Sequence, residues 1–585
     1  MLPLRKIWEQ IRSGPSVEGG SRISGIKQPP PIKIDHRLPA WGALLTQSSA
    51  LWANALDRAR QGPRILIANN VSAFYNSTIF ESLLAVALTL RGAQVHVLLC
   101  DESLPACLNA KMAKIPPSAL VAGQLQKIGC PRCLSRRSAF TDLGISVHYH
   151  SQFLSKEDRE RLHRLATGVS AADVRPFMYH GYAVGEHAYA GALRYYSTGN
   201  LVGQDQSAGV LSTYLESALL TAEVTRRLLK QERFDAVTLH HGIYIPQGIV
   251  TDVCRKEGIP VSTWNVAYRK QCFIFSHDDT YHHTLMTEPV ATWKEAPFSE
   301  KDEDAIRTYL KSRWGGSQDW IYFHDTPDDR LETLVKETGL DPRKPTIGLL
   351  TNVMWDAQLH YPANAFPTML DWIITTIRAF EKRPDLQLLI RVHPAEVRGL
   401  QPSRQFVVDE IRRVFPSLPK NVFVIPPESQ INTYSAMSLC NCVIIYGTKM
   451  GVELTSFGVP VIVAGEAWIR NKGLTIDVTD PKHYQEILDR LPLAKNRLPP
   501  EKVHEALRYA HHFFMRRMIP VNAVSPTEDK AAPFQVRIDG LADLLPGRDQ
   551  GLDVICDGIL KKTPFVYQPG FDIKPSMPVS LGGAV

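Results

Sequence analysis

Two stretches of this 585-residue chain repeat one local order, and this order constrains the fold more than any other feature of the sequence. Residues 236–264 and 443–464 each read as an apolar strand, a turn that contains glycine, a helix, a Gly-x-Pro-Val return and a second strand. Strands that are joined through helices form parallel sheets with helices on both faces. The sequence therefore predicts an α/β fold built on parallel sheets.

The strand and helix pattern forms two series along the chain. The first opens with a strand at 65–69, a helix at about 77–91 and a strand at 94–99, and a polar stretch at 324–345 separates it from the second. Because a single core rarely grows beyond ~300 residues, we expect two Rossmann-like domains. The predicted divisions are an N-terminal extension at 1–60, domains at 61–335 and 340–500, and a C-terminal helix and tail at 501–585.

Charge and apolar run length exclude several classes of protein. The formal net charge of +7 is mild for this length and no Lys/Arg-rich block occurs, so we expect no nucleic-acid partner. The longest apolar runs, such as 83–90, fall short of the ~20 residues that span a bilayer. Residues 1–14 lack the apolar core of a signal peptide, which favours a cytoplasmic location. Their mixture of apolar and basic residues fits either a peripheral contact with the inner membrane or a frayed terminus.

Four of the nine cysteines cluster in the first series and end in a C-x2-C pair; they are Cys100, Cys107, Cys130 and Cys133. Four thiolates close the tetrahedral coordination sphere of a structural zinc ion. The alternative is four reduced, buried thiols. Neither interpretation gives the cysteines a role in catalysis, because four thiolates leave no open position for a substrate.

The turn between strand and helix in the second repeat combines Gly447, Thr448, Lys449 and Glu453. Ligands of open parallel sheets bind at the carboxyl ends of the strands. We expect Lys449 in the first helical turn, where it opposes the helix dipole unless an anion lies in front of it. Glu453 lies one turn further on the same face and could accept bonds from a ribose diol; the alternative is a solvated ion pair with Lys449. In the first interpretation, Glu453→Ala weakens nucleotide binding and leaves the fold intact.

Histidines follow strands at two further places. His393 ends the strand "LQLLIRV" and fits either a phosphate or base contact or a cap on the strand, and Arg391 fits either a buried structural partner or a phosphate ligand. His240 and His241 stand at the corresponding turn of the first repeat. Because successive side chains of an extended segment alternate, we expect one of these two histidines to act and the other to pack.

The motif "RVHPAE" at 391–396, followed by "YGTKMGVELTSFGVPVIVAGEAWIRNKGLT" at 446–475, resembles the bacterial capsule-polysaccharide biosynthesis glycosyltransferases. The resemblance covers about residues 345–480. It implies the GT-B fold, in which two Rossmann-like domains face each other across a cleft, with the donor nucleotide in the C-terminal half and the last helices returning to the first domain. Some members transfer the acidic sugar Kdo from its CMP-activated form.

The resemblance implies a glycosyltransferase, which moves a sugar from a nucleotide-activated donor to a cell-surface polysaccharide or glycolipid. Because no Asp-x-Asp motif stands at a strand end in a nucleotide-binding context, we expect it to be metal-independent and without a catalytic cofactor. His241, or His240 beside it, would take the proton of the acceptor hydroxyl, and Lys449 and His393 would neutralise the leaving phosphate. Arg470 and Lys472 fit either contacts with that phosphate or surface charge. The loop "SHDDTYHH" at 276–283 fits an acceptor-binding loop, with a metal site as the alternative.

Two other functions fit the same sequence. One is a nucleotide-sugar epimerase or hydrolase on the same fold, which would need a further pair of carboxylates in the cleft. The other is a non-catalytic scaffold for polysaccharide assembly, which would bind no nucleotide.

Overall fold

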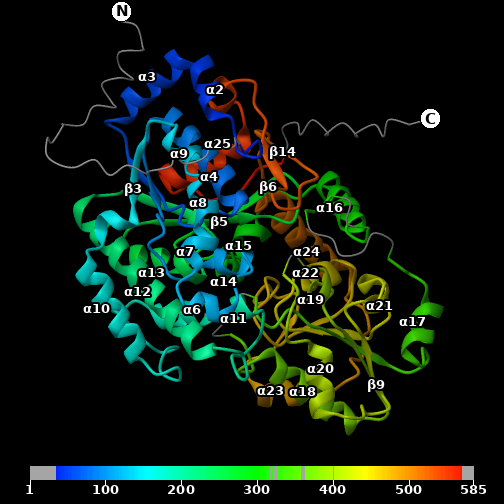
Figure 1. The fold of residues 1–585 in the computed structure, drawn as a ribbon. Coiled ribbons are helices and arrows are strands. Elements are labelled where there is room, and N and C mark those ends of the chain that lie inside the picture. Colours follow the sequence, from blue (N-terminus) through cyan, green and yellow to red (C-terminus); the bar gives the residue numbers. More distant parts are fainter. Residues whose placement is uncertain (1–34, 316–317, 321–326, 357–362, 400, 570–585) are drawn as a thin grey trace, which may run out of the picture. The chain divides into compact units, whose positions relative to one another are not determined.

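The computed structural model describes residues 35–315, 318–320, 327–356, 363–399 and 401–569 (Figure 1). Residues 1–14, which fit either a membrane contact or a frayed terminus, lie outside these residues. Residues His36–Val585 form one compact unit. The strands of this unit form two large sheets and one two-stranded sheet, which confirms the predicted α/β class.

The first sheet has seven strands in the order β13-β6-β5-β4-β1-β2-β3. The strands from β5 to β3 run parallel, whereas β6 and β13 pair antiparallel. The bounds are β1 Arg64–Ile67, β2 Gln94–Leu99, β3 Ser146–Tyr149, β4 Ala236–His240, β5 Val261–Val266, β6 Cys272–His277 and β13 Ile519–Pro520.

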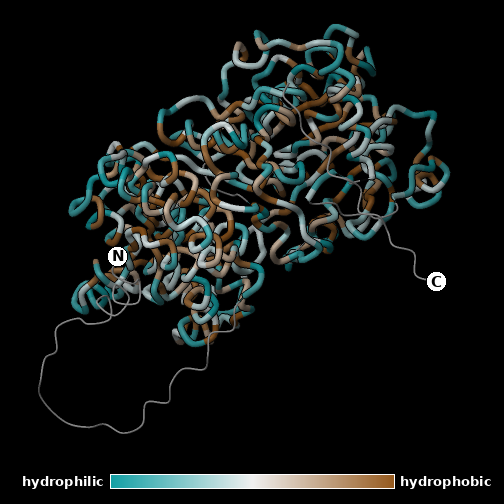
Figure 2. Tube along the Cα trace, turned by 90° about the horizontal axis from the view of Figure 1, so that it is seen from above, coloured by the Kyte–Doolittle hydropathy of each residue, from teal (hydrophilic) through white to brown (hydrophobic). Residues whose placement is uncertain are grey.

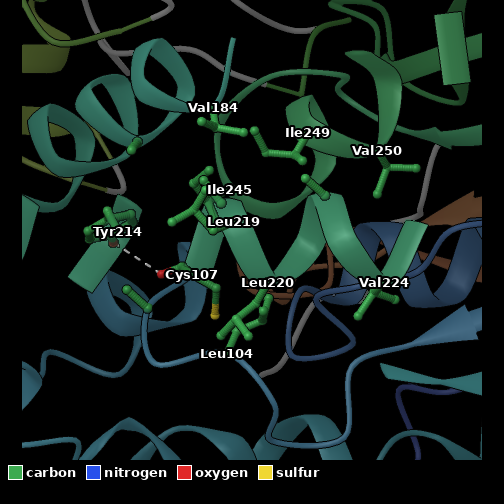
Figure 3. Close-up of a cluster of buried hydrophobic side chains, with 14 of the residues drawn as sticks. Leu104, Cys107, Val184, Tyr214, Leu219, Leu220, Val224, Ile245, Ile249 and Val250 are labelled. Atoms are coloured by element: carbon green, nitrogen blue, oxygen red, sulfur yellow. Dashed lines mark hydrogen bonds between the residues drawn. The ribbon is translucent and has the colours of Figure 1, made fainter. Parts of the chain in front are cut away.

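Helices cover both faces of the first sheet. One face carries α3 (Ser49–Ala59), α4 (Tyr75–Leu90) and α25 (Gln550–Lys561). The other carries α10 (Lys156–Gly168), α11 (Val184–Tyr196), α12 (Ser207–Gln231) and α13 (Ile249–Lys256). Figure 3 shows part of this second core, where α12 contributes Leu219, Leu220 and Val224. Both layers are apolar because strands buried on two faces need apolar side chains on each.

The second sheet has six parallel strands in the order β12-β11-β10-β7-β8-β9. The bounds are β7 Thr346–Leu350, β8 Gln387–Arg391, β9 Val422–Ile425, β10 Cys442–Ile445, β11 Val461–Val463 and β12 Ile476–Asp477. Helices α18 (Met369–Glu381), α20 (Val407–Val414) and α23 (Pro481–Asp489) pack on one face. Helices α21 (Thr433–Ser438), α22 (Met450–Ser456) and α24 (Pro500–His511) pack on the other. In Figure 2 hydrophobic segments lie mostly inside and hydrophilic loops outside.

Part of the predicted N-terminal extension is folded. Helices α2 (Trp41–Gln47) and α3 pack into the first core through the buried Trp41 and Trp52. The Trp41 indole donates to Ser82 Oγ at 3.0 Å, and the Trp52 indole donates to the Leu143 carbonyl at 3.0 Å. The prediction of an extension through residue 60 is therefore wrong for these two helices. Burial of the two tryptophan side chains stabilises these helices. The Pro- and Gly-rich sequence before them gives no sign of this burial.

The polar stretch between the two series contains α17 (Leu331–Thr338), which packs beside β9 and α21 of the second sheet. After the second sheet the chain returns to the first. Strand β13 adds to its edge beside β6, and α25 packs against α4, where Figure 1 shows it in red beside blue. In the part of the chain that the structure describes, no helix is both long and apolar enough to cross a membrane.

Candidate functional site

The turn after β10 carries the residues that the sequence singles out, and we call Gly447–Lys449 together with His393 the second-sheet mouth. Lys449 directly precedes α22 rather than lying in its first turn. Its ammonium lies 3.2 Å from Glu453 Oε1 and 5.0 Å from the centre of the Tyr268 ring. The Thr448 hydroxyl accepts a bond from the Met450 amide at 3.3 Å. Lys449 is 22% exposed, so it is the cation of this turn that a ligand can reach.

Glu453 is fully buried, and both of its carboxylate oxygens are occupied. Oε1 contacts Lys449 and lies 3.3 Å from Arg313 Nε, while Oε2 accepts a hydrogen bond from the Tyr434 hydroxyl. Burial alone would raise the pKa of Glu453, but the charges of Arg313 and Lys449 hold it below its usual value. The carboxylate therefore anchors two cations, and Glu453→Ala should destabilise the fold rather than leave it intact.

Arg313 is the central residue that sequence reasoning missed. It follows α16 (Glu300–Ser312), outside the second sheet, and is 3% exposed. Its guanidinium pairs with Asp319 and donates to the Tyr309 hydroxyl at 2.9 Å. Burial would lower its pKa, but the Glu453 carboxylate raises it, so the group stays charged. No local pattern indicates that a residue 140 positions before Glu453 shares its site.

His393 is the second residue after β8, at the same edge of the sheet. Its Nδ1 accepts a bond from the Ala395 amide at 3.1 Å, and its own amide donates to Thr351 Oγ1 at 3.0 Å. Burial, together with the positive charges of Lys449 and Arg391, lowers the pKa of His393 to about 4. The imidazole is thus neutral at pH 7 and lies within electrostatic range of Lys449. The structure brings these two predicted residues together.

Three other cationic side chains around the second sheet donate hydrogen bonds to backbone carbonyls. Arg391 is buried and donates to the carbonyls of Pro426 and Ser429, as the structural alternative predicts. Arg470 donates to carbonyls around β11, and Lys472 donates to the Met286 and Glu288 carbonyls at 3.2 and 2.8 Å. Arg470 and Lys472 are both buried, so neither is the surface charge that one alternative predicted.

The first-sheet mouth is the turn His240–Gly242 after β4. His240 is buried between Phe74 and Trp264, at ring distances of 5.1 and 5.0 Å. Its amide donates to the buried Glu81 carboxylate at 2.8 Å, and burial lowers the pKa of His240 to about 3. His240 is therefore packed in the core, and His241 is the more exposed of the two histidines.

His241 adopts a left-handed backbone conformation with φ of +73°. Its ring stacks on Tyr244 at 5.5 Å, and burial, followed by the charge of Arg194 and the neighbouring histidines, lowers its pKa well below the usual value. Within the described residues, the buried His241 Nδ1 has no hydrogen-bond partner. A non-glycine residue in this conformation stores strain, which is common at functional sites.

A cavity of about 250 Å³ adjoins the first-sheet mouth. Its lining includes Gly242, Asp252, Arg255, Asp279, His282 and His283. His283 lies 3.4 Å from Asp279 and 3.5 Å from Glu466, and hydrogen bonds to these two carboxylates raise its pKa to about 10. The predicted polar loop therefore lines a cavity with both acidic and cationic groups, which suits a ligand rich in hydroxyls.

Arg194 and Asp356 connect the surroundings of the two mouths. Asp356 lies in the loop after β7, and its Oδ1 is 3.0 Å from Nη1 of Arg194 in α11. It also accepts a bond from the Tyr244 hydroxyl at 3.3 Å, and the Arg194 guanidinium lies 4.7 Å above the Tyr244 ring. Side chains from α11 and from the loop after β7 thus meet at Tyr244, on which His241 stacks.

The four clustered cysteines lie within electrostatic range of one another. Burial raises the pKa of Cys107 most, and Cys133, Cys100 and Cys130 raise it further. Cys133 Sγ accepts a bond from the Ala73 amide at 3.3 Å, and the Cys107 side chain lies near Leu104 and Leu220 (Figure 3). Among the described residues, no group of three or more His, Cys, Asp or Glu side chains is arranged to hold a metal ion. The structural zinc stays a prediction, to be checked by metal analysis of the purified protein.

Residues 325–507 match the family described as "Capsule polysaccharide biosynthesis protein", which confirms the family resemblance over that segment. Two similar solved structures are the beta Kdo 2,4 and 2,7 transferases of Thermosulfurimonas dismutans KpsC. They are 15% and 12% identical, cover 53% and 55% of this chain and 87% and 88% of theirs, and have TM-scores of 0.34 and 0.30. A UDP-GlcNAc 2-epimerase from Neisseria meningitidis is 12% identical over 76% of this chain and 94% of its own, with a TM-score of 0.23. These scores are too low to carry a functional argument. No curated protein matches the sequence significantly.

Proposed function

We propose that this chain, which carries the capsule polysaccharide biosynthesis family segment at 325–507, is a glycosyltransferase of cell-surface polysaccharide synthesis. It takes a sugar from a nucleotide-activated donor, CMP-Kdo being one candidate, and transfers it to a glycan or glycolipid. One observation carries the proposal. The matched segment contains both His393 and Lys449, and these residues follow the carboxyl ends of β8 and β10 at one edge of the same parallel sheet, where such sheets bind ligands.

The second-sheet mouth supplies the donor site in this proposal. Lys449 contacts a donor phosphate, and the neutral His393 bonds the phosphate or the base. Glu453 and Arg313 act through Lys449, since the buried carboxylate keeps its ammonium in place. The α22 helix has only seven residues, so its dipole contributes less here than the two side chains.

The cavity beside the first-sheet mouth supplies the acceptor site. The acceptor hydroxyl attacks the anomeric carbon while its proton passes to a base, for which we propose His241. The bond between the anomeric carbon and the phosphate oxygen breaks, and the nucleotide leaves with the electron pair. Lys449 stabilises the charge that develops on that phosphate.

Calorimetric titration with CMP, UDP and GDP tests the donor site, and mass spectrometry of products with the matching activated sugars tests transfer. Binding of one nucleotide at micromolar concentration, with a new glycosidic product, supports the proposal. Conversion of the activated sugar without an acceptor would indicate an epimerase or hydrolase instead. Absence of binding to all three nucleotides would leave only the scaffold interpretation.

A further inference from the structure

The segment between Glu102 and Asp142 contains no Asp or Glu, although the whole chain has 59 of them among its 585 residues. Its cations occur at ordinary density; they are Lys111, Lys114, Lys127, Arg132, Arg136 and Arg137. The segment includes the short helices α5 (Leu108–Met112), α6 (Pro117–Val121), α7 (Leu125–Ile128) and α8 (Cys130–Leu134). Its positive charge therefore comes from the absence of carboxylates rather than from a block of cations.

Helices α5 to α8 form a layer that packs on α12. Each of them contributes a side chain to the core that contains α12; these are Ala110, Leu120, Leu125 and Cys130. The Tyr214 hydroxyl of α12 donates to the Cys107 carbonyl at 3.2 Å (Figure 3). Because the inner side of the layer faces α12, the exposed side chains of the layer lie on its outer side.

Hydrogen bonds hold α5 and α8 together. The Asn109 side chain donates to the Gly129 carbonyl at 2.8 Å, directly before α8. Arg132 Nη1 donates to the Met112 carbonyl at 3.4 Å, at the end of α5. Arg132 thus lies beside the turn that carries Lys114. Helix α7 packs on α8, and Figure 1 shows α6, α7 and α8 in a row.

The outer side of the layer presents cations and apolar side chains together. Lys114, Lys127 and Arg132 are exposed. In the part of the chain that the structure describes, none of these three cations forms an ion pair. Val121 and Ile128 are 41% and 47% exposed. We call these five residues the basic face.

Neighbouring residues leave the basic face positive and extend its apolar part. Burial, with the charges of Cys133 and Glu102, raises the pKa of Cys130 to about 12, so the Glu102 carboxylate lies near the layer. One carboxylate does not offset three cations. Val121 packs against the first turn of α12, and Val202, in the loop before that turn, is 85% exposed.

We propose that the basic face is a docking surface for a bilayer that contains anionic lipids. Its cations lie at the level of the lipid phosphates, and Val121 and Ile128 enter the interface between headgroups and acyl chains. Each cation near an anionic bilayer strengthens binding by about fivefold. A soluble polyanion would use the cations but gain nothing from the apolar side chains, so their combination favours a membrane. The inference goes beyond the proposed function, because it holds for any donor and acceptor.

Sedimentation of the whole protein with vesicles tests the charges. We expect vesicles of phosphatidylcholine and phosphatidylglycerol to bind it at least about tenfold more tightly than vesicles of phosphatidylcholine alone. This advantage should fall as salt rises. The triple variant Lys114→Ala/Lys127→Ala/Arg132→Ala should bind the anionic vesicles at least about tenfold more weakly than the native protein.

The double variant Val121→Ser/Ile128→Ser tests the apolar side chains. We expect it to bind the anionic vesicles about tenfold more weakly, because neither side chain enters the interface. Its binding to polygalacturonate, a soluble polyanion, should equal that of the native protein. The matched control is Val414→Ser/Leu439→Ser, which changes side chains of similar exposure, 41% and 49%, and should leave vesicle binding unchanged.

The matched control for the charges is Lys420→Ala/Lys482→Ala/Lys495→Ala, which removes three exposed cations around the second sheet and should change vesicle affinity less than about twofold. Equal binding to neutral and anionic vesicles would overturn the proposal, as would native affinity in the triple variant of the basic face. Binding to polygalacturonate without binding to vesicles would assign the face to a soluble polyanion instead. Titration with CMP keeps the proposed function separate, since nucleotide binding and vesicle binding can each fail while the other persists.

Discussion

The two mouths occupy equivalent places on two sheets but differ in the charges beside them. At the second, Lys449 and Arg313 flank the buried carboxylate of Glu453; the pKa values of Arg313 and Glu453 are shifted toward their charged forms, whereas burial lowers the pKa of Lys449. At the first, His240 and His241 lose their charge through burial. A site that keeps cations suits a phosphate, whereas a site with neutral imidazoles suits proton transfer to or from a hydroxyl. This difference fits the proposed donor and acceptor sides better than the shared strand-turn-helix order does.

Removing the central cation should break the charged mouth most strongly. We expect Arg313→Met to lower the free energy of unfolding by about 3–5 kcal/mol, because it leaves Glu453 and Asp319 buried with fewer partners. Urea denaturation measures the change. The control is Arg307→Met in an exposed pair with Glu303, which should cost under about 1 kcal/mol. An equal loss of unfolding free energy in the two variants would show that the buried cluster stabilises the fold no more than an exposed ion pair does.

The cationic His283 should make the contact between the sheets sensitive to alkali. Its pKa is raised from 6.5 to about 10 by Asp279 and Glu466, so its stabilisation is complete below pH 6.5 and is lost as pH rises through 10. We expect His283→Gln to lower the free energy of unfolding by about 1–3 kcal/mol at pH 6, with the difference from the native protein shrinking toward pH 10.5. Denaturation at several pH values checks this. A difference that stays constant with pH would contradict the ion-pair role.

Lys449→Ala tests the phosphate assignment at the charged mouth. We expect CMP to bind about tenfold more weakly, since one charge-assisted contact is lost, while cytidine without phosphate binds as before. Titration of both ligands gives the comparison. An equal loss for nucleoside and nucleotide would place Lys449 against the base or ribose instead.

His241→Asn tests the neutral mouth with the smallest expected effect on binding. Asparagine tolerates the left-handed backbone of this position, so the variant removes the imidazole without added strain. We expect CMP affinity to change less than about twofold and sugar transfer to fall by at least a hundredfold. Product analysis by mass spectrometry measures transfer. Transfer at the native rate would assign the base to another group, with Asp356 the next to substitute.

Local pattern predicted the parts of the fold that depend on short stretches of chain. Strand β2 begins and ends where the alternation of apolar residues places it, and the glycine turns put Lys449 and His241 at strand ends. The interior of the site depends on contacts between distant segments, which no periodicity encodes. Glu453 could be predicted to face a ligand, but its burial requires Arg313 and Tyr434, which belong to other elements. The same holds for Trp41, whose partner Ser82 lies on a different helix.

The return of the chain to the first sheet sets an order on synthesis. Strand β6 has its outer neighbour only when residues 519–520 have been made, and α25 completes the core around α4 later still. Until then a nascent chain presents an open sheet edge and an uncovered apolar helix, both of which favour association with other chains. The first sheet is therefore the last part of the protein to be finished, although most of it is translated first. A ribosome that stalls after the second sheet would hold a second half ready to fold beside a first half whose sheet edge and core are still uncovered.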